Sequence, residues 1–170
     1  MQAIQITLLL VFPVLAVIGG LKDLTSYTIP NWISLALIAA FFPAALISGA
    51  PLGEIGLCLA VGLGALVLGM GMFAAGWIGG GDGKLFAVCA LWVGASGALP
   101  FLLYTCLAGG ALTFAILFLR SGFFTPIVAG GPGWLRNLGK EGGDLPYGVA
   151  IAIGALAAFP EGALARGILG

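Results

Sequence analysis

Two aspartates are the residues of this chain best suited to chemistry. Asp82 lies in the glycine-rich stretch 79–84 between two long apolar segments, and Asp23 follows the first apolar segment. When two carboxylates approach each other, one pKa rises and the pair shares a proton, because both cannot stay ionised cheaply. Such a pair can deprotonate a water molecule and protonate a leaving amine. The chemistry that these residue types suggest is hydrolysis without a covalent intermediate.

Both aspartates also have a simpler structural interpretation. Asp82 precedes an expected helix and could serve only as its amino-terminal cap. Asp23 could be a turn residue that accepts a local hydrogen bond, and Lys84 could be an interfacial lysine whose stem lies along apolar surface. The glycines around Asp82 can adopt positive φ and let an extended substrate backbone come close. Substrate positioning is therefore the alternative for Gly79, Gly80, Gly81 and Gly83.

The sequence lacks the side chains that several other kinds of site require. There is no histidine for a zinc site or for a Ser-His or Cys-His nucleophile. The three cysteines are far apart and form no Cys-x-x-Cys pair. The glycine run lacks the Walker spacing, and no basic stripe indicates nucleic-acid binding. The two aspartates are therefore the leading catalytic candidates, and nucleic acid is not an expected partner.

Long apolar runs must position these aspartates. The 170 residues are 61% hydrophobic and only 7% charged, whereas about 25% charged is usual for soluble domains. Because about 20 apolar residues cross the hydrocarbon core as a helix, we expect one all-α domain over 1–170, a polytopic membrane protein with about six transmembrane helices. Glycines 94 and 97 and Pro100 divide the run 85–119 into two spans. The predicted spans cover about residues 4–21, 30–47, 55–75, 84–95, 99–119 and 146–160.

Basic residues predict the orientation, since loops rich in Lys and Arg stay in the cytoplasm. Alternating the loops places five basic residues on one side and Arg166 alone on the other. The amino terminus then lies outside, and both aspartates lie at the cytoplasmic edge of their spans. The loop 120–145 is also cytoplasmic, and its aromatic residues make it apolar enough to lie on the lipid headgroups. The five basic residues on the cytoplasmic side are Lys22, Lys84, Arg120, Arg136 and Lys140.

Three ordered motifs, which together extend over most of the chain, resemble those of the type IV prepilin peptidases. The first is Asp23 followed by Thr-Ile-Pro-Asn at 28–31, and the second is Gly-x-Gly-Asp-x-Lys at 79–84. The third is Leu-Pro-Tyr-Gly-Val-Ala at 145–150. That family consists of Gly-x-Gly-Asp aspartic proteases of the bacterial inner membrane. The chain is most similar to the short form that serves Flp-type, tight-adherence pili.

The resemblance implies that Asp23 and Asp82 are the catalytic pair and activate a water molecule at the cytoplasmic face. It also implies a substrate, a pilin precursor whose leader stays cytoplasmic while its hydrophobic helix lies in the bilayer. No metal ion or other cofactor is required for this cleavage. Substrate-positioning roles would fall to Gly79, Gly80, Gly81, Gly83, Lys84, Pro146 and Tyr147.

Longer members of this family carry a cytoplasmic domain with paired Cys-x-x-Cys motifs after the first span, and they also methylate the new amino terminus. Only residues 24–29 separate the first two predicted spans here. Methyltransferase activity, and with it a use of S-adenosylmethionine, therefore does not follow from the resemblance. Two other classes of function stay open, a small proton-coupled transporter with the aspartates as a relay and a non-catalytic membrane subunit of a pilus-assembly machine. The sequence makes no prediction of the oligomeric state.

Overall fold

The computed structural model describes residues 2–140, 143–162 and 164–166, and this part of the chain is helical without any strand. Four helices, α1 (Gln2–Ser26), α2 (Asn31–Ile47), α3 (Leu52–Ala74) and α4 (Gly80–Leu119), are followed by three shorter α-helices and two 3-10 helices. The predicted all-α fold is confirmed. The shorter elements are η1 (Gly122–Phe124), α5 (Thr125–Gly130), α6 (Gly133–Leu138), α7 (Tyr147–Ala158) and η2 (Phe159–Glu161).

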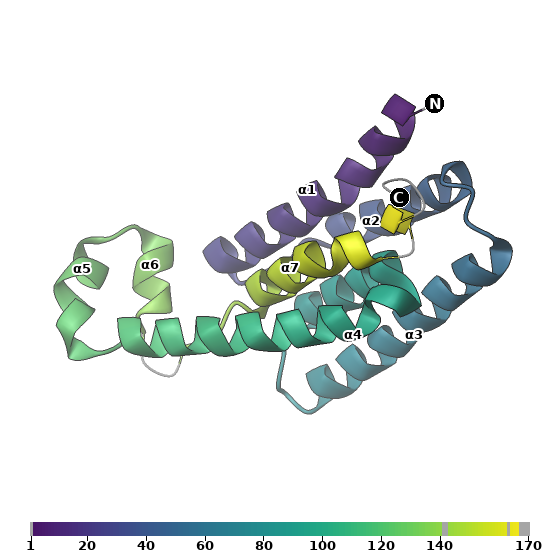
Figure 1. The fold of residues 1–170 in the computed structure, drawn as a ribbon. Helices are drawn as coiled ribbons and strands as arrows, with labels where there is room; N and C mark the ends of the chain where they lie inside the picture. The colour runs from purple at the N-terminus through teal and green to yellow at the C-terminus, as the bar shows by residue number, and fades with distance from the viewer. Residues whose placement is uncertain (1, 141–142, 163, 167–170) are drawn as a thin grey trace.

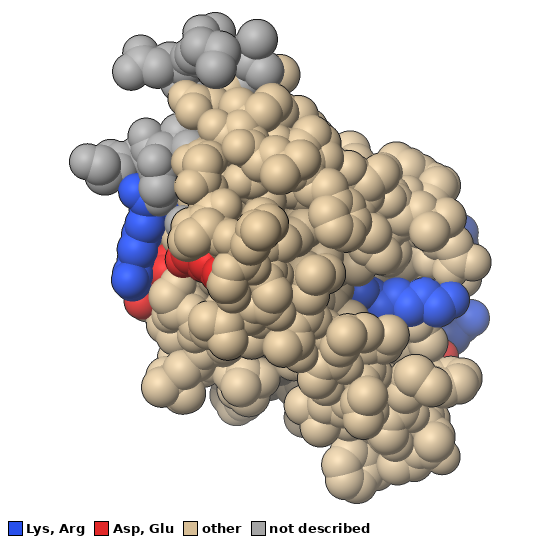
Figure 2. Space-filling model, turned by 90° about the vertical axis from the view of Figure 1, so that its right-hand side faces the viewer, with Lys and Arg blue, Asp and Glu red and all other residues tan. Residues whose placement is uncertain are grey.

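Three helices of the described part are long and apolar enough to cross a membrane, over Thr7–Ser26, Leu52–Ala74 and Gly80–Leu119. Two shorter apolar helices cover Asn31–Ile47 and Tyr147–Glu161. Many large apolar side chains point outward, and the face in Figure 2 is mostly uncharged, with a few Lys, Arg, Asp and Glu side chains toward its left and right. Such a surface suits a lipid environment. The chain is therefore a membrane protein, while the number of crossings and the side of its amino terminus stay predictions.

The long helix α4 is interrupted at Gly94, whose φ of 63° and ψ of −167° are not helical. The rings of Phe86 and Phe101 stack with centroids 5.1 Å apart, although a straight helix would separate residues 15 apart by about 22 Å. The chain therefore folds back on itself at this glycine, and the two parts of α4 lie side by side. The sequence predicts a division of this run at residues 94–97, before Pro100. The interruption lies at Gly94, and Pro100 lies inside the second helical part.

Other boundaries differ from the predicted spans. Helix α1 continues to Ser26 instead of ending near residue 21, so Asp23 lies in its last turns. The predicted loop 120–145 contains η1, α5 and α6, and its residues 141 and 142 lie outside the described part of the chain. These short helices sit beyond the far end of α4, at the opposite end of the molecule from both termini (Figure 1).

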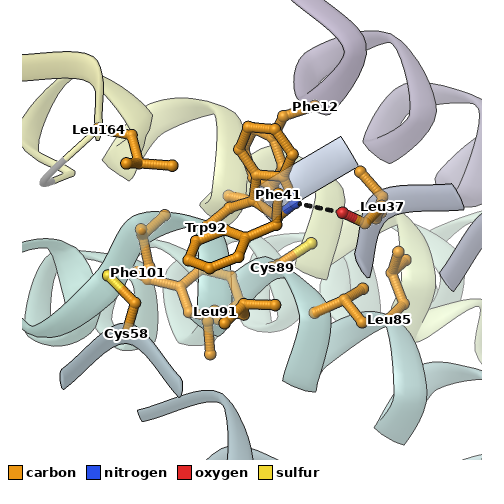
Figure 3. Packing of buried hydrophobic residues seen from close by; sticks show 14 of the residues in the cluster. Phe12, Leu37, Phe41, Cys58, Leu85, Cys89, Leu91, Trp92, Phe101 and Leu164 are labelled. Atoms are coloured by element: carbon orange, nitrogen blue, oxygen red, sulfur yellow. Dashed lines mark hydrogen bonds between the residues drawn. The ribbon is translucent and has the colours of Figure 1, made fainter. Parts of the chain in front are cut away.

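The helices meet around Trp92, the largest fully buried side chain. Its ring stacks on Phe12 of α1 at 5.2 Å between centroids and meets the edge of Phe41 of α2 at 5.9 Å. Its Nε1–H donates a hydrogen bond of 3.0 Å to the carbonyl oxygen of Leu37 (Figure 3). Helix α7 packs between α1 and α4 (Figure 1). Trp92 thus links α4 to both α1 and α2, while α7 packs against α1 on one side and α4 on the other.

We expect Trp92→Phe to lower the free energy of unfolding by about 1–3 kcal/mol, because it removes the indole N–H, leaves the Leu37 carbonyl unpaired and opens a small cavity. Denaturant unfolding in detergent micelles, followed by circular dichroism, measures this loss. Trp32→Phe is the matched control, since Trp32 is 51% exposed. Equal stabilities of the two variants would contradict a central role for Trp92.

Candidate active site

Three segments that are distant in sequence meet at one end of the helix bundle. They are the last turns of α1, the first turn of α4 and the first turn of α7. Asp23 comes from α1 and is 5% exposed, and Asp82 comes from α4 and is 6% exposed. Together with Ser34, these are the buried polar residues of the described chain. Two of the few acidic side chains of a membrane protein are thus buried in the same region.

Asp23 is held by the beginning of α7. Its Oδ2 atom accepts a hydrogen bond of 2.7 Å from the backbone N–H of Gly148, which is 125 positions away. The first N–H groups of a helix have no partner within the helix, and the positive end of the helix dipole favours a carboxylate there. The interpretation of Asp23 as a local turn residue is therefore wrong, since the residue is helical and its side chain makes a tertiary hydrogen bond.

Asp82 does cap its own helix, but it uses only one oxygen to do so. Its Oδ2 atom accepts a hydrogen bond of 3.1 Å from the backbone N–H of Gly79. The other oxygen, Oδ1, is buried and has no hydrogen-bond partner among the described residues. Buried polar atoms are rarely left unpaired in proteins. The cap and a chemical role are thus compatible, because the cap leaves a second acceptor free.

Ile29 packs between Gly81, which precedes Asp82, and Gly148, which donates to Asp23. A Cβ placed on Gly81 would lie 3.1 Å from Ile29 Cβ, and one on Gly148 would lie 2.9 Å from Ile29 Cδ1. Asp23 is close enough for its charge to interact electrostatically with the Asp82 carboxylate, and the backbone N–H of Gly148 lies near both carboxylates. The Ile29 side chain therefore brings the beginnings of α4 and α7 together, so that the two aspartates become neighbours.

Two of the four glycines around Asp82 serve close packing within the protein. None of the four has a positive φ, a conformation that the described glycines adopt at Gly49, Gly76 and Gly94. The expectation that they use this freedom is not met, because 80–83 are already helical. A Cβ on Gly83 would meet the backbone of Gly69 on α3 at 3.3 Å. Gly83 thus lets α3 approach the Asp82 turn, and Gly81 does the same for Ile29.

Two of the remaining predicted site residues, Lys84 and Tyr147, line two different cavities. Lys84 donates a hydrogen bond of 2.9 Å from Nζ to Oδ1 of Asn31, and both residues line an apolar cavity of about 510 Å³ between α2, α3 and α4. Tyr147 lines a second apolar cavity of about 540 Å³ between α3, α4 and α7. Pro146 is buried just before α7. All three motifs seen in the sequence thus adjoin this region.

Comparison with known families identifies the chain. A model of the type IV leader peptidase family matches residues 10–131. The chain belongs to the type IV leader peptidase family. No curated protein and no solved structure matches it at a significant level. The matched range contains both aspartates, and this membership makes the protein a membrane peptidase.

In this leader peptidase, Gly148 and Ile29 also belong to the site, although neither was a predicted site residue. Both lie inside the motifs quoted for the family, but neither has a reactive side chain. Their role follows from contacts between α1, α4 and α7, so only their place in the motifs could have drawn attention to them.

In the described part of the leader peptidase, no group of three or more Asp, Glu, Cys or His residues could hold a metal ion.

Arg120, at the end of α4, holds the segment that leads into α7. Its Nε atom donates to the carbonyl oxygen of Leu138 at 2.8 Å, and its Nη2 atom donates to those of Gly143 at 3.0 Å and Asp144 at 3.4 Å. Hydrogen bonds from a charged group are stronger than neutral ones. Arg120 therefore keeps the base of the 120–145 segment of this leader peptidase closed. The end that it holds lies four residues before Gly148, the donor to Asp23.

We expect Arg120→Gln to loosen this segment, because glutamine cannot supply the same three donors. Limited proteolysis of the leader peptidase in detergent should cut within residues 120–145 roughly 10-fold faster, since local opening becomes cheaper by about 1–2 kcal/mol. Arg136→Gln is the control, because it removes a basic residue of the same segment that is exposed. Equal cleavage rates in the two variants would show that the Arg120 hydrogen bonds do not hold the segment.

Proposed function

We propose that this chain is an aspartic endopeptidase that removes the leader from pilin precursors, with Asp23 and Asp82 as its catalytic pair. The observation that carries this proposal is the presence of two buried carboxylates that are close enough for the charge of Asp23 to act on Asp82, one of which has an unpaired oxygen. Membership of the type IV leader peptidase family supports the reaction class. Buried acidic groups in membrane proteins are costly, and where they occur they usually serve function.

The proposed mechanism uses a single proton shared by the pair. Two neighbouring carboxylates favour the state in which one is ionised and the other protonated. The ionised carboxylate takes a proton from a water molecule, whose oxygen attacks the scissile carbonyl carbon, while the protonated partner donates to the carbonyl oxygen. The tetrahedral intermediate then collapses: the aspartate that took the proton from water passes it to the leaving nitrogen, the C–N bond breaks, and the other aspartate takes back a hydroxyl proton as the carbonyl re-forms, so that the pair again shares one proton. The macroscopic pKa values belong to the pair, so neither aspartate is assigned permanently as acid or base.

The charge distribution supports cleavage at the cytoplasmic face of the inner membrane. Five of the six basic residues fall on one side when the predicted spans alternate, and both aspartates are at the span ends on that side. A precursor with a cytoplasmic leader and a hydrophobic helix in the bilayer would present its cleavage site at this depth. Residues 79–84 and 146–147 adjoin the aspartates and would position the substrate strand. The resemblance to the short form of the family favours Flp-type precursors, and no observation supports methylation of the product.

Cleavage of a precursor by the purified protein tests this function. The protein in lipid vesicles is mixed with Flp-type and other type IV pilin precursors, and the product is followed by electrophoresis and mass spectrometry. We expect a shorter product whose new amino terminus lies at the boundary between leader and hydrophobic helix. If no precursor is cut while the same vesicles carry a proton flux, the transporter interpretation replaces the proposal. If neither activity is found but the protein binds pilus-assembly components, the assembly-subunit interpretation does.

A further inference from the structure

Tyr27, which directly follows α1, has an unfavourable backbone conformation. It is the only non-glycine residue of the described chain with a positive φ, at 52°. A bulky residue in this region is strained, and such strain gathers at functional sites. Its backbone N–H donates a hydrogen bond of 2.8 Å to the carbonyl oxygen of Asp23. The residue is thus tied to the turn that carries a proposed catalytic aspartate.

The hydroxyl group of Tyr27 is buried and has no hydrogen-bond partner among the described residues. The charged groups that act on it are Arg120, Asp144 and Asp23. The Arg120 guanidinium already donates to three backbone carbonyls. A buried O–H without a partner is costly, so a native protein keeps one only where something else pairs with it. The strain and the unpaired hydroxyl are two independent signs of a role beyond packing.

We infer that Tyr27 binds the substrate, and that its O–H donates a hydrogen bond to a main-chain carbonyl of the peptide beside the scissile bond. This inference rests on the proposed peptidase function. An extended peptide presents carbonyl groups on alternate sides of its backbone, so a donor close to the catalytic pair can pair with one regardless of the side-chain sequence. Tyr27 lies four residues from Asp23 and two from Ile29, which packs between the beginnings of α4 and α7.

The protonation state of Tyr27 fits a donor. Burial raises the pKa of its hydroxyl above the ordinary value, and the charges of Asp144 and Asp23 act in the same direction while Arg120 opposes them. The group therefore stays protonated at neutral pH. An O–H that keeps its proton can donate to a carbonyl throughout the pH range in which the peptidase would work.

Tyr27→Phe separates this role from a structural one. The variant keeps the ring and removes only the unpaired hydroxyl, so the free protein should be as stable as wild type or more stable. With a pilin precursor in lipid vesicles, we expect kcat/KM to fall roughly 10- to 100-fold. Tyr104→Phe is the matched control, because Tyr104 lies on α4 and is 39% exposed; its kcat/KM should equal that of wild type.

Each other outcome overturns the inference. A Tyr27→Phe enzyme with kcat/KM within about twofold of wild type would show that the hydroxyl does not bind the substrate. A loss of activity that follows a lowered melting temperature would assign Tyr27 a structural role. If wild type cleaves no precursor, the proposed function fails and this inference fails with it. If wild type cleaves the precursor but Tyr27→Phe does not show the expected fall in kcat/KM, only this inference fails and the proposed function stands.

Discussion

Replacing either Asp23 or Asp82 by asparagine should abolish precursor cleavage, with kcat/KM lowered at least about 10³-fold. Asparagine has the size of aspartate but can neither take a proton from water nor hold the shared proton. Each single variant therefore removes the function of the pair, and the double variant should be no worse than either one. Conversion of precursor to product, measured at equal concentrations of folded protein, gives these rates.

The Asp82→Asn variant also separates catalysis from capping. Its amide oxygen can still accept the N–H of Gly79, which Asp82 Oδ2 accepts now. If Asp82 were only a helix cap, the variant would stay active. Glu54→Gln is the control for the removal of a carboxylate, since Glu54 lies in the first turn of α3 and does not belong to the site. Normal processing by either aspartate variant would refute the paired mechanism.

Gly148→Ala should be almost as harmful as loss of an aspartate. The added methyl group would lie 2.9 Å from Oδ2 and from Cβ of Asp23, and 2.9 Å from Cδ1 of Ile29. These distances are too short for contacts between heavy atoms, so α7, Asp23 or Ile29 must shift. A shift of about 1 Å at a catalytic group can cost 10²-fold in rate. We therefore expect kcat to fall about 100-fold or more, although alanine is the better helix former.

Gly110→Ala is the matched control for this effect. Gly110 also lies in a helix, and a Cβ placed there meets no described atom within 4 Å. Its activity should equal that of wild type, and its stability should be equal or slightly higher. Melting temperatures of both variants show whether Gly148→Ala acts on the site or on the whole fold. A Gly148→Ala enzyme with the kcat of wild type would mean that the close approach of α7 to Asp23 and Ile29 is not needed for catalysis.

Much of the architecture could be predicted from the sequence because its causes are local. Long uncharged runs predict apolar helices wherever they occur, and the absence of alternating polar residues excludes strands. The break near Gly94 was predictable for the same reason, since closely spaced glycines and Pro100 weaken a helix. The candidate aspartates and the family could be recognised because their motifs are contiguous in sequence. Helix ends were less accurate, as α1 continues through Asp23 to Ser26.

The sequence by itself determined the membrane-helix class, the two aspartates and the order of the three motifs. Only the tertiary structure decided that Asp23 accepts the Gly148 N–H, that Ile29 packs against both Gly81 and Gly148, and that the Tyr27 hydroxyl is unpaired. Hydropathy and helix capping act over a few residues, so a local pattern reveals them. The meeting of residues 125 positions apart depends on how closely α1, α4 and α7 can pack, and that is decided by side-chain shapes on all three helices together.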